Sequence, residues 1–462
     1  MRLGVFARGL ESLDPLRRDR YRSVMAPRVL LVNPPIYDFS AYDFWLKPYG
    51  LLRVAGNLRD RAELRLFDYL DRRHPSVDDK DLRSDDWGRG ELPREAAPTP
   101  NVLAGIPRRF RRYGLSRRHF QQFLQEHGPF DFALVQTVMT YWYLGVQEVL
   151  EDIRKWCPGT QVVLGGVYAT LCPGHARSLG ADLVVEGSRL EPLWRFLGLE
   201  PNRGGLPFWD GYPRLEVGIL KLAYGCPFRC TYCSVPQVDP TFTAYPVERS
   251  LAELEFLCRL GVTNIAFYDD ALLYRPDQIL RPFLQGVIDR GLAVQFHTPN
   301  ALNARFISSE LAELMVEAGF QSFFLGFESS AYDWQRRTGG KVYSQELIRA
   351  VESLDAAGAG RDAITAYLII GHPNSDQQHV EDSMRFAHDL GIRVMLSEFS
   401  PIPGTPDGER CREWVDLNQP LCHNKTAFCL KFLGVARVNR LKSLCRELNQ
   451  KLWRAGRVNA PV

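Results

Sequence analysis

The chain has 462 residues, of which 45% are hydrophobic and 24% are charged, and its formal net charge is +3. This length predicts two domains with connecting material, and this composition excludes a wholly disordered chain. The near balance of charges gives no sign of a protein that coats nucleic acid. No uninterrupted apolar run reaches about 18 residues, and the N-terminus shows no apolar signal region. We therefore expect a cytoplasmic protein without a membrane span.

The N-terminal half alternates between apolar strands and helices. Met25 stands directly before the first apolar strand, so we interpret residues 1–27 as a loose tail or an overlong start. Strands are predicted at residues 29–33, 64–68, 131–139, 161–164 and 181–186, with helices at residues 49–59 and 145–156. Such alternation is typical of a doubly wound parallel sheet, which we assign to residues 28–199.

Residues 71–128 interrupt this pattern. They are rich in charged residues, proline and glycine, and we expect them to form an insertion. The insertion contains six arginines: Arg108, Arg109, Arg111, Arg112, Arg117 and Arg118. Such a cluster suits a phosphorylated substrate or RNA. We favour a solvated surface helix, because no aromatic stacking platform accompanies the arginines.

A second domain is predicted after residues 200–213, a linker in which proline and glycine break both helices and strands. Strands are predicted at residues 215–223, 264–268, 293–297, 322–326, 363–370 and 394–399, with helices at residues 247–260, 308–318, 344–357 and 377–390. Six such units predict a partial (β/α)6 TIM-like barrel over residues 214–406, with its chemistry at the carboxyl ends of the strands. Residues 407–462 predict a short helical C-terminal tail, amphipathic over 437–454. The expected fold class is therefore α/β.

Three cysteines lie in one loop directly after the first barrel strand: Cys226, Cys230 and Cys233. Ten cysteines in the chain, three of them this close together, indicate metal ligation in a reducing compartment rather than disulfides. Three thiolates can hold three irons of a 4Fe-4S cubane and leave the fourth iron open to a chelating substrate. The alternatives are a loop of chemically quiet cysteines and a zinc site, which needs four ligands and finds no fourth close by in sequence.

This loop resembles the signature of the radical S-adenosylmethionine (SAM) superfamily, Cys-x3-Cys-x2-Cys with an aromatic residue, here Tyr232, before the last cysteine. The resemblance covers residues 215–406. It implies SAM contacts at Tyr232 in the loop and near the ends of later strands, at Asp269, Asp270, Glu328, Ser329, Gly371, Pro403 and Gly404. It further implies reductive cleavage of SAM to a 5′-deoxyadenosyl radical, with a reductant such as flavodoxin or ferredoxin. No catalytic residue is identified by it.

The N-terminal domain resembles the cobalamin-binding domain of one large branch of that superfamily. The resemblance places cobalamin contacts at strand ends, at Asn33, Thr137, Gly165 and Gly166. The chain departs from one cobalamin pattern, because no Asp-x-His-x-x-Gly follows its first strand and residues 37–40 read Tyr-Asp-Phe-Ser. A histidine ligand to cobalt is therefore not expected. The alternative is a structural domain that covers the barrel and binds no cobalamin.

These observations lead to three hypotheses about function. The first is a cobalamin-assisted radical enzyme that methylates or remodels an unreactive carbon of a small molecule. The second is a cobalamin-free radical enzyme of the rearrangement or RNA methylthiolation type, although the sequence shows no C-terminal RNA-binding β domain and nucleic acid is not the expected partner. The third is a non-catalytic iron–sulfur protein.

A second cluster is suggested by Cys411, Cys422 and Cys429 with His423. Their spacing matches no compact ligand loop. We therefore expect buried thiols at these positions.

Overall fold

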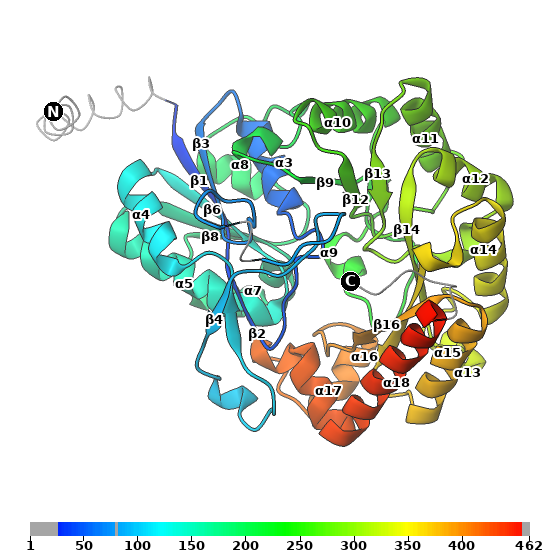
Figure 1. Ribbon diagram of the computed structural model, residues 1–462. Coiled ribbons are helices and arrows are strands. Elements are labelled where there is room, and N and C mark those ends of the chain that lie inside the picture. The colour runs from blue at the N-terminus through cyan, green and yellow to red at the C-terminus, as the bar shows by residue number, and fades with distance from the viewer. Residues whose placement is uncertain (1–25, 79–81, 455–462) are drawn as a thin grey trace, which may run out of the picture.

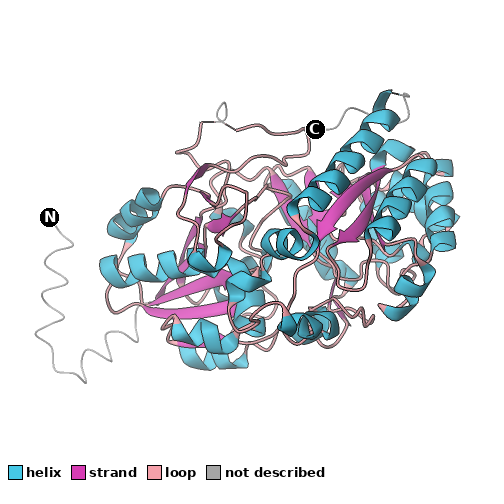
Figure 2. Cartoon of the chain, turned by 90° about the horizontal axis from the view of Figure 1, so that it is seen from below, coloured by secondary structure: helices cyan, strands magenta, loops and turns pink. Residues whose placement is uncertain are grey.

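The computed structural model describes residues 26–78 and 82–454, so all but the last two residues of the segment interpreted as a loose tail or overlong start, residues 1–27, lie outside it. Within the described part of the chain, two groups of strands, each surrounded by helices, lie side by side (Figure 1, Figure 2). No helix in these two ranges is long and apolar enough to cross a membrane.

The N-terminal body is a parallel sheet in the order β3-β1-β6-β7-β8. Its strands are β1 (Arg28–Asn33), β3 (Glu63–Asp68), β6 (Phe132–Thr137), β7 (Gln161–Gly166) and β8 (Leu183–Val185). Its helices are α3 (Tyr49–Leu58), α4 (Arg117–His127), α5 (Tyr143–Trp156), α6 (Val167–Leu171), α7 (Pro173–Ser178) and α8 (Glu191–Leu197). Hydrophobic clusters cover both faces of the sheet, so residues 29–32 of the interior strand β1 are fully buried. The predicted doubly wound sheet is confirmed.

The insertion after β3 holds more regular structure than predicted. A small antiparallel sheet is formed by β2 (Ile36–Asp38), β4 (Arg94–Ala96) and β5 (Arg111–Tyr113), and α4 is the crossover helix between β3 and β6. The arginines lie in a turn, in β5 and at the start of α4. Arg112 is buried, with its guanidinium 2.6 Å from a carboxylate oxygen of Glu148. The expectation of one solvated surface helix was wrong. The arginines lie in different elements, and Arg112 is buried in an ion pair with Glu148, which is distant from it in the sequence.

The second body is a six-stranded parallel sheet in the order β16-β15-β14-β13-β12-β9, which confirms the predicted partial barrel. Its strands are β9 (Val217–Leu220), β12 (Asn264–Phe267), β13 (Gln295–His297), β14 (Phe320–Glu328), β15 (Ile364–Ile370) and β16 (Arg393–Glu398). Around it lie α10 (Val247–Arg259), α11 (Leu280–Asp289), α12 (Ser309–Glu317), α13 (Tyr332–Arg337), α14 (Ser344–Ala356) and α15 (Gln377–Asp389) (Figure 1). The cysteine loop is flanked by β10 (Ala223–Tyr224), α9 (Val235–Val238) and β11 (Thr243–Ala244).

A loop of the N-terminal body enters the barrel. Trp45 is fully buried, its ring is stacked on His297 with 4.6 Å between centroids, and its carbonyl oxygen accepts a hydrogen bond from the Tyr268 hydroxyl. His297 itself is hydrogen-bonded to Ser322 of β14 and Asn264 of β12, which places it inside the barrel. The incomplete barrel thus obtains part of its interior packing from the N-terminal half.

The C-terminal segment connects the two bodies. It contains α16 (Pro406–Glu409), a 3-10 helix (Pro420–His423), α17 (Lys425–Leu433) and α18 (Val435–Arg454), and α18 packs along α15 and β16 (Figure 1, red). Its 3-10 helix reaches back to the N-terminal body, where His423 is 2.9 Å from the Thr140 hydroxyl oxygen. The ends of the N-terminal strands are therefore bordered by the barrel and by this segment.

Candidate functional site

The cysteine loop leaves the barrel through a glycine turn. Gly225 has a φ of +74°, and a Cβ there would lie 2.6 Å from the Thr241 carbonyl oxygen, so the turn into Cys226 requires glycine. Cys230 is buried, Cys226 and Cys233 are half-buried, and all three are free thiols. Burial raises the pKa of each thiol, and the three sulfurs also act on one another electrostatically. Three free thiols this close on one loop fit the donor set of a 4Fe-4S cluster.

Two later segments hold this loop in place. The Thr231 amide donates to the Thr338 carbonyl oxygen at 3.2 Å. The Thr231 hydroxyl donates to Asp407, whose own amide donates to the Thr231 carbonyl oxygen at 3.1 Å. Asp407 also lies 2.9 Å from Nε2 of His372, and both of these side chains are buried. His372 and Asp407 therefore position the cysteine loop, a role that sequence reasoning did not assign to them.

Glu328 and Tyr232 lie beside the cysteines. Glu328 ends β14 with a φ of 67°, a conformation that residues other than glycine rarely adopt. Burial raises the pKa of the Glu328 carboxyl, which acts electrostatically on Cys230 and Tyr232. The Tyr232 ring stacks on Trp334, with 6.0 Å between centroids. The structure thus groups two of the predicted SAM-binding residues with the predicted cluster ligands.

Asp269 and Asp270 follow β12 and bind the strand that leads into the loop. Asp269 accepts hydrogen bonds from the amides of Leu222 at 2.9 Å and Ala223 at 2.7 Å, and burial raises its pKa to about 7. Asp270 pairs with Lys221 at 3.2 Å. Both carboxyl groups have these partners within the chain, and their contact with SAM stays a prediction.

The remaining predicted SAM residues lie in three places. A Cβ on Gly404 would lie 2.6 Å from Oε1 of Gln237 in α9, so Pro403 and Gly404 border the cysteine loop. A Cβ on Gly371 would lie 2.9 Å from Sγ of Cys429, so Gly371 faces α17 instead. The Ser329 hydroxyl oxygen accepts a hydrogen bond from the Ala331 amide at 3.2 Å, which directs it toward the start of α13.

The residues predicted to contact cobalamin lie at the strand ends of the N-terminal sheet. Gly165 and Gly166 line a pocket there. The Thr137 hydroxyl supports them, because it donates to the Gly165 carbonyl oxygen at 3.0 Å and accepts from the Ala169 amide at 3.0 Å. The Asn33 amide group donates to Asp68 at 2.7 Å and is not part of the pocket lining. Three of the four residues are thus grouped by the structure.

We call this pocket the β7 slot. It has a volume of about 220 Å³ and is lined mostly by apolar side chains of β6, β7, β8, α3 and α8, with Arg53 among them. Its wall on the barrel side includes Tyr224, Val238 and Asp239. No histidine belongs to its lining. A largely apolar slot at the carboxyl ends of parallel strands fits the base and nucleotide tail of a corrinoid.

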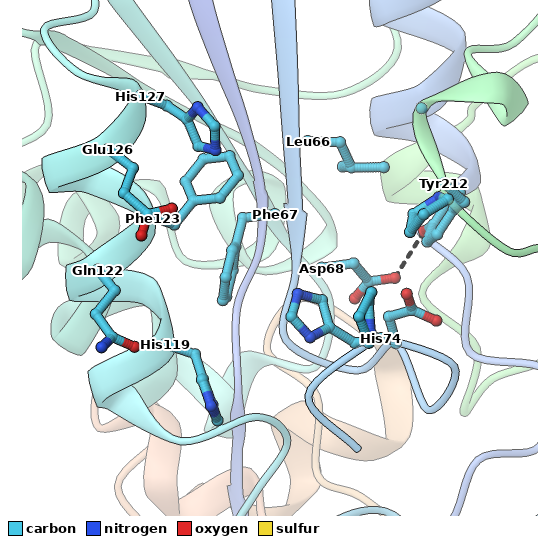
Figure 3. Close-up of a pocket in the computed structure, with 14 residues that line it drawn as sticks. Leu66, Phe67, Asp68, His74, His119, Gln122, Phe123, Glu126, His127 and Tyr212 are labelled. Carbon is cyan, nitrogen blue, oxygen red and sulfur yellow. Dashed lines mark hydrogen bonds between the residues drawn. The ribbon is translucent and has the colours of Figure 1, made fainter. Parts of the chain in front are cut away.

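A second hollow, of about 340 Å³, lies at the edge of the same sheet between β3, α4 and the residues around Tyr212 (Figure 3). Side chains of α4 face Phe67 and His74 across it, and the Tyr212 hydroxyl donates to Asp68 at 2.6 Å. None of its lining residues belongs to the cysteine loop or to the β7 slot. It is therefore separate from the cysteine loop and from the β7 slot, although Asn33 binds Asp68 in its lining.

The cysteines of the C-terminal segment pack separately. The Cys411 thiol donates to the Asp407 carbonyl oxygen at 3.3 Å, and Cys411 and Cys429 are buried free thiols, as expected, whereas Cys422 is half-buried. Among the residues that the structure describes, no three His, Cys, Asp or Glu side chains are arranged around a single metal ion, and this includes the cysteine loop. A cubane does not require such an arrangement, because each thiolate binds a different iron.

Residues 220–387 match the radical SAM superfamily. An uncharacterized methyltransferase of Pyrococcus horikoshii is 28% identical over 248 residues, which is 53% of this chain and 50% of that protein. The ribosomal protein uS12 methylthiotransferase RimO of Moorella thermoacetica is 27% identical over 224 residues, which is 45% of this chain and 49% of that protein. The chain thus spans about half the length of the curated relatives it matches.

Two solved structures share most of the fold. The radical SAM methyltransferase TsrM from Kitasatospora setae, with cobalamin and a 4Fe-4S cluster bound, has a TM-score of 0.65 at 16% identity and covers 95% of this chain and 93% of that chain. The cobalamin-dependent radical SAM enzyme OxsB with aqua-cobalamin has a TM-score of 0.55 at 13% identity and covers 96% of this chain and 63% of that chain. At these identities the likeness shows the fold alone.

Proposed function

From the match of residues 220–387 to the radical SAM superfamily, we propose that the chain is a cobalamin-assisted radical SAM enzyme that methylates or remodels an unreactive carbon of a small molecule. The match makes it an enzyme, and the reaction is the proposal. The solved structures with the same two-body arrangement contain cobalamin, which supports the choice of cofactor.

One observation carries this proposal: the β7 slot and the cysteine loop share a wall. Tyr224, directly before Gly225 and Cys226, lines the slot, and so do Val238, the last residue of α9, and Asp239, which follows it. A corrinoid whose tail enters the slot would therefore lie next to the iron–sulfur site. Such adjacency serves a reaction in which two cofactors act on one substrate.

The residues of the loop have separable roles in this proposal. Cys226, Cys230 and Cys233 would hold the 4Fe-4S cluster, which supplies the electron that cleaves SAM reductively. Phe228 packs near Phe306, with 6.0 Å between ring centroids, and would exclude water from the cluster. Glu328 would bind SAM through its carboxylate beside the loop.

The N-terminal body would bind the corrinoid without a protein ligand to cobalt. Asp38, at the position where a histidine motif would begin, is buried and accepts hydrogen bonds from Trp142 at 2.9 Å and from Asn424 at 2.8 Å. The slot would hold the corrinoid tail through its apolar side chains, and no residue that lines it would supply an imidazole to cobalt.

A second candidate is a cobalamin-free radical enzyme, which the match to RimO favours. In both readings a small flavodoxin-type or ferredoxin-type reductant supplies the electron. A small-molecule substrate distinguishes the first candidate from methylthiolation of a macromolecule, which is RNA in the hypothesis above and ribosomal protein uS12 for RimO.

The test is anaerobic reconstitution followed by three measurements on the same preparation. We expect about four irons per chain, release of 5′-deoxyadenosine with dithionite and SAM, and corrinoid absorbance that elutes with the protein after incubation with hydroxocobalamin. The triple variant with Ala at 226, 230 and 233 should lose the first two and keep the third. If wild-type protein with full iron carries no corrinoid, the cobalamin-free enzyme replaces the present proposal.

A further inference from the structure

A lysine that sequence reasoning did not single out lies against the cysteine loop. The segment that carries it turns through Gly339 and Gly340, both with positive φ, at +116° and +58°. A Cβ on Gly339 would lie 3.1 Å from Cα of Cys230, which is closer than nearly all real contacts of this kind. Lys341 therefore follows a stretch of backbone that runs in direct contact with a predicted cluster ligand.

The Lys341 ammonium occupies space that a glycine leaves open. A Cβ on Gly326 would lie 2.8 Å from Nζ of Lys341 and 3.3 Å from Oε1 of Glu328. The ammonium and the Glu328 carboxylate thus both lie over the bare surface of β14 at Gly326. Any side chain at this position would displace the ammonium.

The charge on Lys341 lies at the edge of the cysteine loop. Two residues before Lys341, the backbone at Gly339 lies against Cys230, and the ammonium shares the space over Gly326 with the Glu328 carboxyl group. Among the residues that the structure describes, the Lys341 ammonium has no hydrogen-bond partner and no carboxylate within 4.0 Å. Its donors are therefore available to the cluster and its ligands.

We propose that Lys341 is a positioning residue whose ammonium is the counter-charge of the iron–sulfur cluster and raises its reduction potential. This inference rests on the proposed function and deepens it. Three thiolates already give the cluster negative charge, and one-electron reduction by the external reductant adds another. A nearby cation stabilises the reduced form more than the oxidised form, because cluster potentials follow local charge and hydrogen bonding.

The experiment compares Lys341→Met, which keeps the length of the side chain without its charge, with Lys341→Arg, which restores the charge. Lys451→Met, on the exposed surface of α18, is the matched control. Each reconstituted protein is titrated with dithionite and redox mediators, without SAM or substrate, while the cluster is followed by electron paramagnetic resonance. At a fixed potential we expect the ratio of reduced to oxidised cluster to fall about tenfold in Lys341→Met, equivalent to about 59 mV for a one-electron couple.

The other variants separate charge from structure. Lys341→Arg and Lys451→Met should keep the wild-type midpoint, and Gly326→Ala should lower it by less than Lys341→Met, because its Cβ displaces the ammonium without removing it. An unchanged midpoint in Lys341→Met with full iron overturns this inference alone. Loss of iron in Lys341→Met also overturns it, since the lysine would then hold the loop structurally. Absence of iron from wild-type protein would instead overturn the proposed function.

Discussion

At the scale of single residues, Glu253 is a carboxyl group buried where three segments meet. It lies in α10 of the barrel, 3.2 Å from the Tyr49 hydroxyl of α3 and 3.4 Å from Nε1 of Trp209 in the predicted linker. Its side chain is fully buried, and burial raises its pKa from 4.5 to about 7. The folded state therefore binds this proton more tightly than the unfolded state does.

The resulting pH dependence can be measured with Glu253→Gln, which keeps the acceptor and removes the charge. Stability of the wild type should fall as pH rises from about 4.5 to about 7 and then level off, because ionisation costs more in the folded state. The variant should gain up to about 3 kcal/mol over the wild type across this window. Thermal melts at several pH values check this, with the exposed Glu352→Gln as control. A constant difference between pH 5 and pH 8 would contradict the expectation.

At the scale of elements, the end of β7 contains two glycines with different functions. Gly166 has a φ of +114°, and a Cβ there would lie 2.2 Å from the Thr137 carbonyl oxygen, so any substitution would disrupt the backbone itself. A Cβ on Gly165 would meet only Val185, at the ordinary distance of 3.9 Å, and Gly165 lines the β7 slot. Gly166 therefore shapes the strand end, whereas Gly165 leaves room in the slot.

Gly165→Leu should fill the β7 slot and abolish corrinoid binding while leaving the fold and the iron content intact. The change in affinity for hydroxocobalamin is expected to exceed about tenfold, since the lost pocket volume removes apolar contact with the ligand. Gel filtration with hydroxocobalamin measures it. The matched control is Gly174→Leu on the exposed surface of α7, where nothing lies within 4 Å of an added Cβ. Equal corrinoid uptake by the two variants would exclude the slot as the binding site.

At the scale of the whole molecule, the C-terminal segment ties the barrel to the N-terminal strand ends. Asn424 has two roles there: its amide group donates to the buried Asp38 at 2.8 Å, and its side-chain oxygen accepts from the Ala427 amide at 2.9 Å, which caps α17. Loss of one side chain thus removes a helix cap and leaves a buried carboxyl group short of a donor.

Asn424→Ala should lower the free energy of unfolding by about 2–4 kcal/mol, the sum of a lost cap and a lost hydrogen bond to a carboxylate. Urea titration of the apoprotein measures this, and limited proteolysis should show earlier cleavage within the C-terminal segment. Asn418→Ala, exposed in the same segment, is the control. If the two variants unfold at the same urea concentration, the bridge to Asp38 does not hold the two bodies together.

The periodic elements and the cysteine loop were determined by local sequence. Apolar runs such as residues 29–32 identify buried parallel strands without any knowledge of their neighbours in the sheet. Cys226, Cys230 and Cys233 are close together because they are near one another in the chain. In the barrel each strand pairs with the strand of the preceding unit, whereas in the N-terminal sheet β6 pairs with β1 and not with β3. These features allowed the fold class to be predicted without coordinates, and they make the three cysteines the predicted ligands of the cluster.

Tertiary structure alone decided which distant side chains meet at that site. Lys341 reaches Glu328 over Gly326, and Asp407 reaches Thr231 beside His372, through contacts that join separate segments and leave no local pattern in the sequence. The buried ion pair between Arg112 and Glu148 is another contact between separate segments. The sequence does not reveal it, so the arginine-rich stretch was predicted to be solvated surface. Ion pairs and close contacts between backbone segments depend on how the elements pack against one another. Hydrophobic periodicity and the spacing of the cysteines are properties of single segments of the sequence.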